Sequence, residues 1–230
     1  MDKKPAASQP NDSPAETRPL AGIIYYTDPL CCWSWAMEPQ WCRLQNEYGK
    51  HLSVSYRMIG LLPSWDRFND SIHSLSRPSQ MGPEWMQAAR VAGQPVAHKI
   101  WITDPPASSF PACIAVKCAD DQSRAFGAGY LRAVREAVMV DGRNVAKTHV
   151  LLDIAQRLSS SPPGFDLTRF KASLMGPHGR ELFRHDFQEA QYLGIRRSPT
   201  LLFRSGNNTV MLQGYQTWEA LEQTIGKMGP

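Results

Sequence analysis

The stretch Asp28-Pro29-Leu30-Cys31-Cys32-Trp33-Ser34-Trp35-Ala36-Met37-Glu38-Pro39 decides the fold. The run before it, residues 22–27, is β-branched and aromatic and predicts a buried strand. After Cys31, apolar residues recur at helical spacing as far as Tyr48, and Gly49 ends the pattern. We therefore expect Cys31 at the start of a helix, where backbone N–H groups and the helix dipole favour the thiolate, the nucleophile of disulfide exchange.

Strand patterns occur at both ends of the chain, and helical patterns fill its middle. Residues 52–58 alternate between apolar and polar types, which predicts a strand with one buried face. Helices are expected at 107–119, 126–140, 145–158, 167–174 and 179–193, then a hairpin from 200–203 and 209–212, and a last helix at 218–227. The order predicts an α/β thioredoxin fold, a mixed sheet built as βαβ then ββα, with an inserted all-helical domain.

This order also predicts the domain organisation. Residues 1–20 are rich in Pro, Ser, Ala, Asn and Asp and are expected to form a disordered tail. Residues 21–62 and 194–230 would form the thioredoxin-like domain, and residues 63–193 the helical insertion.

The segment 28–39 resembles the active-site segment of cytoplasmic DsbA-family proteins of the FrnE kind, which read Asp-Pro-x-Cys-x-Trp-Cys before a Glu-Pro pair. Residues 101–112 resemble the start of the helical insertion in that family. The chain is also similar to kappa-class glutathione transferases and 2-hydroxychromene-2-carboxylate isomerases, whose Ser-Trp pair matches Ser34-Trp35. The DsbA resemblance implies thiol–disulfide chemistry, and a cis Ser198–Pro199 bond opposite Cys31.

Ser34 departs from the DsbA pattern, because it stands where that family has its second cysteine. A serine can hydrogen-bond to the Cys31 thiolate but cannot resolve a mixed disulfide. What remains is a monothiol route, in which Cys31 attacks a disulfide and an external thiol such as glutathione releases it. The expected catalytic residues are Cys31 and Ser34, and the expected substrate-binding residues are Cys32, Trp33, Ser198 and Pro199.

The other cysteines are weaker candidates for a resolving thiol. Cys42 lies eleven residues along the predicted helix, roughly 16 Å away at 1.5 Å per residue, beyond the ~7 Å that a disulfide spans. A disulfide between the adjacent Cys31 and Cys32 would be strained. Cys113 opens a helix of the insertion and is kept as a candidate, while Cys118 is expected to be buried and inert.

Composition narrows the function classes. The chain has 25 basic and 21 acidic residues and a net charge of +4, without a basic run interleaved with aromatics, which argues against nucleic acid. No apolar stretch approaches the ~18 residues of a membrane span. The first residues lack the apolar core of an export signal, so a cytoplasmic location is expected. Five irregularly spaced cysteines favour reduced thiols, and no metal or cofactor is expected, with glutathione as a possible co-substrate.

Three functions stay open. The leading interpretation is a DsbA-like thiol–disulfide oxidoreductase acting through Cys31 on protein thiols and disulfides or on glutathione. The second is a kappa-class-like glutathione transferase or isomerase, in which Cys31 replaces the catalytic serine. The third is a non-enzymatic DsbA-like adaptor that presents a partner protein to a protease.

Overall fold

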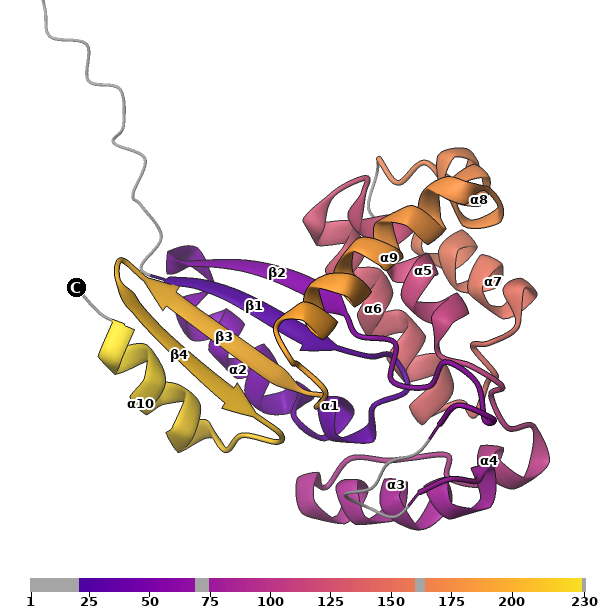
Figure 1. Cartoon of the computed structure of the whole chain (residues 1–230), viewed down its shortest axis with the longest axis horizontal. Coiled ribbons are helices and arrows are strands. Elements are labelled where there is room, and N and C mark those ends of the chain that lie inside the picture. Colours follow the sequence, from indigo (N-terminus) through magenta and orange to yellow (C-terminus); the bar gives the residue numbers. More distant parts are fainter. Residues whose placement is uncertain (1–20, 69–74, 160–163, 229–230) are drawn as a thin grey trace, which may run out of the picture.

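The computed structural model describes residues 21–68, 75–159 and 164–228. The predicted tail, residues 1–20, and most of the predicted loop at 160–164 lie outside them. In the described residues, four strands form one sheet in the order β2-β1-β3-β4 (Figure 1). Its strands are β1 (Ala21–Thr27), β2 (Leu52–Met58), β3 (Thr200–Ser205) and β4 (Asn208–Gln213).

The sheet is mixed, as predicted. β1 pairs with β2 in parallel, and both β1–β3 and β3–β4 are antiparallel. A parallel pair needs a crossover connection, which the helices between β1 and β2 supply. The prediction of a thioredoxin fold, with βαβ followed by ββα, is confirmed.

Helices fill the chain between β2 and β3 and follow β4. They are α3 (Pro78–Ala92), α4 (Ile100–Thr103), α5 (Phe110–Asp120), α6 (Arg124–Met139), α7 (Thr148–Ser159), α8 (Leu167–Met175), α9 (Pro177–Tyr192) and α10 (Trp218–Met228). The sequence pattern located α5 to α10 to within a few residues. It did not locate α3 or α4, because Gly82 and Pro83 interrupt the first and the second has only four residues.

The helix expected after Cys31 is split in two. α1 (Cys32–Ala36) and α2 (Glu38–Tyr48) meet at Met37, and the short 3-10 helix η1 (Gly49–His51) follows α2. Pro39 therefore lies in the first turn of α2 rather than in a helix interior. A proline is tolerated there because its missing N–H would have no helical partner.

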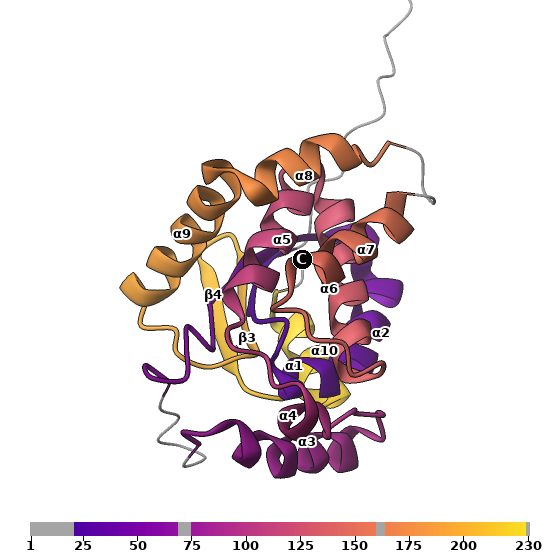
Figure 2. The ribbon, with the colours of Figure 1, turned by 90° about the vertical axis from the view of Figure 1, so that its right-hand side faces the viewer.

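The two faces of the sheet pack against different helices. Leu201 and Phe203 belong to the large core that also contains Trp218 and Leu221 of α10. Leu202 points to the opposite face, because side chains alternate along a strand, and packs with Ala190 at the end of α9. Figure 2 shows α9 and α10 on opposite sides of β3 and β4. In both views, α3 and α4 lie beyond α1.

Candidate functional site

Cys31 lies where β1, α1 and the start of β3 meet. It is the N-cap residue of α1, and its sulfur accepts a hydrogen bond from the backbone N–H of Ser34 at 3.3 Å. The thiol donates to the backbone carbonyl of Ser198, with 3.1 Å between Sγ and O. The following peptide bond, Ser198–Pro199, is cis. The structure thus brings together the active-site stretch and the proline segment, which are far apart in sequence.

The Cys31 thiol is buried, with 4% of the residue exposed. Burial raises its pKa above the ordinary value, and the nearby charge of Asp28 adds to the rise. Hydrogen bonds from the side chains of Ser198 and Ser34 and from the backbone N–H of Ser34 oppose the shift without reversing it. The expectation of a lowered pKa is therefore wrong: α1 has only five residues, and desolvation outweighs what its N-terminus contributes.

Ser34 is part of a row of hydroxyl groups beside the thiol. Its Oγ lies 2.8 Å from the Thr27 hydroxyl and 3.0 Å from the Ser198 hydroxyl. Ser34 and Thr27 are buried, and Ser198 is half-buried. The side chain in the resolving position thus joins the end of β1 to the loop before β3.

Cys32 and Trp33 are the first two residues of α1. Cys32 is 4% exposed and belongs to the large core, and burial raises its thiol pKa well above the ordinary value. Cys32 therefore packs in the core, and its predicted contact with a substrate stays a prediction. Trp33 is half-buried; its indole N–H donates to Glu84 of α3 at 2.5 Å, and its ring centroid lies 6.4 Å from that of Tyr215. The hydrogen bond from Trp33 to Glu84 links α1 to α3.

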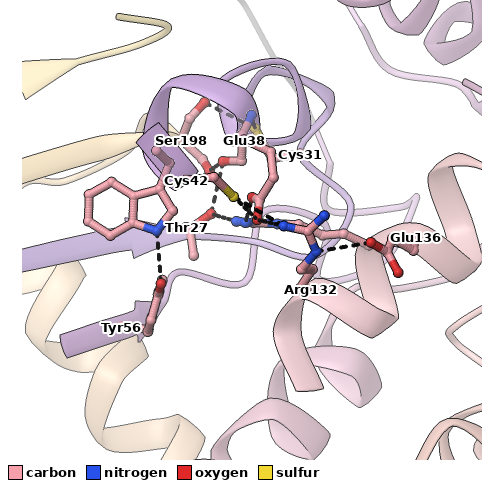
Figure 3. Close-up of polar contacts among 11 residues, drawn as sticks. Thr27, Cys31, Glu38, Cys42, Tyr56, Arg132, Glu136 and Ser198 are labelled. Atoms are coloured by element: carbon pink, nitrogen blue, oxygen red, sulfur yellow. Dashed lines mark hydrogen bonds and ion pairs between the residues drawn. The ribbon is translucent and has the colours of Figure 1, made fainter. Parts of the chain in front are cut away.

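A buried charged pair continues the polar row into the helical insertion. Arg135 of α6 is 1% exposed, and its guanidinium donates to Glu38 at 2.9 Å and to the Thr27 hydroxyl at 2.5 Å. Arg132, one turn earlier, donates to the Cys42 sulfur at 3.1 Å. Figure 3 shows these contacts running from Arg132 towards Cys31 and Ser198. The hydroxyl row and α6 are therefore joined by hydrogen bonds.

Asp28, which follows β1, joins the site to residues of the helical insertion. It is fully buried, and one carboxylate oxygen accepts a hydrogen bond from the backbone N–H of Leu30 at 2.8 Å. The other oxygen accepts from the backbone of Leu61 at 2.6 Å, the Ser109 hydroxyl at 2.8 Å and the Cys113 thiol at 3.3 Å. Burial raises its pKa against these four donors. Cys113 thus points its thiol at Asp28.

Sequence reasoning missed Arg135, Glu38 and Thr27. One signal for Arg135 was present, because it occupies a position within the apolar stripe formed by Leu131, Val134 and Val138. A charged residue inside a buried stripe needs a buried partner. The identity of that partner could not be read from the chain, since Glu38 lies 97 positions away.

A hollow in the described residues is lined by side chains other than those of the Cys31 site. It has a volume of about 510 Å³ and is lined mainly by α9 residues, together with Arg57 and Lys117. Its buried charges are mutually paired: Asp186 contacts Lys117 at 3.1 Å and Arg57 at 3.5 Å. Within residues 21–68, 75–159 and 164–228, no group of three or more His, Cys, Asp or Glu side chains could hold a metal ion. In the same residues, every helix is too short or too polar to cross a lipid bilayer.

A family model described as "Thioredoxin" matches residues 25–223. The chain belongs to the thioredoxin family. Its fold is that of the DsbA-like members: the cytosolic disulfide reductase DsbM from Pseudomonas aeruginosa aligns with a TM-score of 0.69 at 22% identity, over 90% of this chain and all of that one. A structure of DsbM with GSH aligns too. A 2-hydroxychromene-2-carboxylate isomerase aligns at 0.64 and 19% identity, over 90% of this chain and 95% of that one.

A curated relative of this thioredoxin-family chain is named as an adapter protein, unlike the structural neighbours. The ClpXP adapter protein SpxH of Halalkalibacterium halodurans is 28% identical over 200 residues, which cover 87% of this chain. The chain spans 64% of the length of that relative. The structural neighbours are thus named as a disulfide reductase and an isomerase, whereas the curated relative is named as a ClpXP adapter.

Proposed function

We propose that this protein is a partner-binding adaptor built on a DsbA-like thioredoxin fold, which presents another protein to a protease. The observation that carries the proposal is the state of Cys31. Its thiol is buried, its pKa is raised, and Ser34 takes the place of a resolving cysteine. A redox-cycling thiol needs the opposite properties, namely exposure, a lowered pKa and a second thiol within reach.

Similarity to SpxH supports the same function. That relative is named a ClpXP adapter, and the matched region covers most of this chain. The structural neighbours DsbM and the isomerase share the fold at 22% identity or less, and a shared fold does not by itself determine activity.

The test compares wild-type protein with Cys31→Ala. Both tagged proteins are used to capture partners from cells of the source organism, and the enriched protein is then purified. We expect both forms to enrich the same protein, and to accelerate its degradation by purified ClpXP from the same organism to the same extent. Trp33→Ala, which changes the neighbouring side chain and keeps the thiol, is the matched control for local disturbance.

An enriched protein whose degradation is unchanged by either form would contradict the adaptor function. So would a Cys31→Ala protein that no longer enriches the partner while Trp33→Ala does. Insulin reduction driven by glutathione is measured in parallel, and wild-type activity that Cys31→Ala lacks would favour the second candidate below.

The second candidate is a monothiol oxidoreductase of the DsbA type. The observation in its favour is the 3.1 Å contact between the Cys31 sulfur and the Ser198 carbonyl, next to the cis bond. In this reaction the Cys31 thiolate attacks oxidised glutathione, forms a mixed disulfide and releases one glutathione thiolate. A second external thiol then attacks the mixed disulfide and regenerates Cys31. Intact mass after exposure to oxidised glutathione tests it: one glutathione mapped to Cys31 supports this route, and an unmodified Cys31 excludes it.

A further inference from the structure

The four strands of the sheet contain no acidic residue. Their charged side chains are Arg57 and Arg204. The chain from Ala190 to Trp218 also lacks Asp and Glu, and adds Arg196 and Arg197 just before Ser198. Positive charge is therefore concentrated near β3 and β4, the two strands of the sheet that lie farthest from β2.

Three of these arginines lie at the protein surface. Arg196, Arg197 and Arg204 are all exposed. Among the residues that the structure describes, no acidic side chain forms an ion pair with any of the three. Arg57 differs, because its guanidinium is paired with the carboxylate of Glu189 at 2.9 Å. The charge of Glu189 is therefore already neutralised by Arg57.

The strand register places an apolar row between the arginines. Ile24, Leu202 and Met211 face one another across β1, β3 and β4 and share one face of the sheet. Thr209 lies opposite Arg204 at one end of β4, and Gln213 lies opposite Thr200 at the other. All three outward side chains of β4 on this face, Thr209, Met211 and Gln213, are exposed, and Met211 is 42% exposed.

Among the residues that the structure describes, no strand pairs with the outer side of β4. β4 is the last strand of the sheet, with β3 on one side. Its sequence, Asn-Thr-Val-Met-Leu-Gln, contains no proline or charge of the kind that commonly protects an edge strand from pairing. Figure 1 shows β4 at the border of the sheet, with α10 beside it on the side of the large core.

We propose that the edge of β4, with Arg196, Arg197, Arg204 and Met211, binds an extended acidic segment of a partner protein as an added strand. Backbone hydrogen bonds to β4 would provide affinity, and the arginines would select carboxylates. Thr200 and Arg204 lie about 13 Å apart at 3.3 Å per residue. Arg204 lies near one end of β3, and Arg196 and Arg197 lie before its other end. A matching ligand therefore carries acidic side chains towards both ends of an extended segment, at least about four residues apart, with an apolar side chain between them.

This inference rests on the proposed adaptor function, because it names the surface that an adaptor would offer. The probe is the fluorescein-labelled peptide Gly-Glu-Thr-Val-Thr-Glu-Gly, and the matched control peptide has Gln at both Glu positions. We expect the Glu peptide to bind the full chain at least about tenfold more tightly than the Gln peptide, and to lose affinity as salt is raised.

Protein variants locate the binding surface. Arg204→Gln and the double variant R196Q/R197Q are each expected to weaken peptide binding about fivefold, as is typical of lost charge pairs at a rim. Arg90→Gln is the matched control, since Arg90 is an exposed arginine of α3. Methylation of alternate backbone nitrogens of the peptide, on one edge, should abolish binding, whereas methylation on the other edge should not.

Three results would overturn the proposal. The first is that the Glu and Gln peptides bind with equal affinity. The second is that Arg90→Gln and Arg204→Gln weaken binding of the Glu peptide equally. The third is that a single-stranded oligonucleotide of the same charge binds as tightly as the Glu peptide, with the same dependence on the arginines. If the peptide fails while the captured partner is still delivered to ClpXP, the β4 surface is wrong and the adaptor function stands. If the partner also fails, the adaptor function is wrong.

Discussion

At Cys31, burial, a neighbouring carboxylate and hydrogen bonds act on the same thiol in different directions. Removal from water and the charge of Asp28 favour the protonated thiol, whereas hydrogen bonds from the side chains of Ser198 and Ser34 and from the Ser34 backbone N–H favour the thiolate. Burial is the largest of these effects, so the pKa rises. The thiol therefore stays protonated near neutral pH and donates its hydrogen bond to the Ser198 carbonyl.

Alkylation kinetics check this state. We expect the rate of Cys31 modification by iodoacetamide to keep rising from about pH 7 to about pH 9 without a plateau, because only the thiolate reacts. Half-buried Cys42, followed by peptide mapping in the same samples, is the internal control for access and should react faster. A plateau below about pH 8 would contradict the raised pKa.

Arg135 matters to stability because its partners are buried with it. Arg135→Met leaves Glu38 without its guanidinium and is expected to lower the free energy of unfolding by about 3–5 kcal/mol. Urea denaturation measures the loss. Arg132→Met is the matched control, because that side chain is 51% exposed and should cost less than about 1 kcal/mol. The double variant R135M/E38Q should recover part of the stability, and a larger loss in it would contradict the buried-pair explanation.

Among the elements, α9 is attached to the sheet by two carboxylates, of which Asp186 accepts a hydrogen bond from the backbone N–H of Met58 at 3.0 Å. Glu189 accepts from the Tyr26 hydroxyl at 2.7 Å and from Arg57 at 2.9 Å. Partial burial opposes ionisation of Glu189, but the Tyr26 and Arg57 hydrogen bonds outweigh it and lower the pKa. A lowered carboxyl pKa gives stability that is present above the unfolded value of 4.5 and is lost as the pH falls through the folded value.

Glu189→Gln tests this attachment. We expect the variant to be less stable than wild type at about pH 7, and the difference to shrink as the pH is lowered towards about 3. Thermal unfolding across that pH range measures it. Glu181→Gln, an exposed α9 carboxylate paired with Arg184, is the matched control and should show little effect at any pH. A difference between Glu189→Gln and wild type that does not change with pH would rule out the carboxylate as its source.

The elements also show what a sequence can predict. β1 and β2 were predicted nearly to the residue, because buried or alternating side chains mark a strand locally. The positions of Cys31, Ser198 and Pro199 were also accessible, through the motif and its resemblance. The contacts of Arg135 with Thr27 and of Asp28 with Ser109 were not, since each joins residues more than 80 positions apart.

At the scale of the whole molecule, sheet and helices share one core. The large hydrophobic cluster contains Ile23 and Phe203 from the sheet together with Val134 and Leu151 from the helices between β2 and β3. Neither part could expose its side of this cluster to water without a large loss of hydrophobic stabilisation. We infer that the sheet and the helices unfold together.

Coincident transitions would demonstrate this. We expect a single urea transition with the same midpoint by far-ultraviolet circular dichroism, which reports mainly the helices, and by tryptophan fluorescence. W85F, which removes a fluorophore of α3, and W41F, which removes one of α2, should leave the two midpoints coincident with each other. A second transition, or midpoints that separate, would show that the helical part unfolds on its own.

The pairing of β1 with β3 has a consequence for how the chain is made. Tyr26 and Thr200 are neighbours in the sheet, yet about 170 residues of chain are synthesised between them. At typical ribosomal speeds this takes on the order of ten to thirty seconds. For most of that interval the nascent chain displays β1 and β2 without the strand that completes them, so chaperones have many seconds in which to bind there.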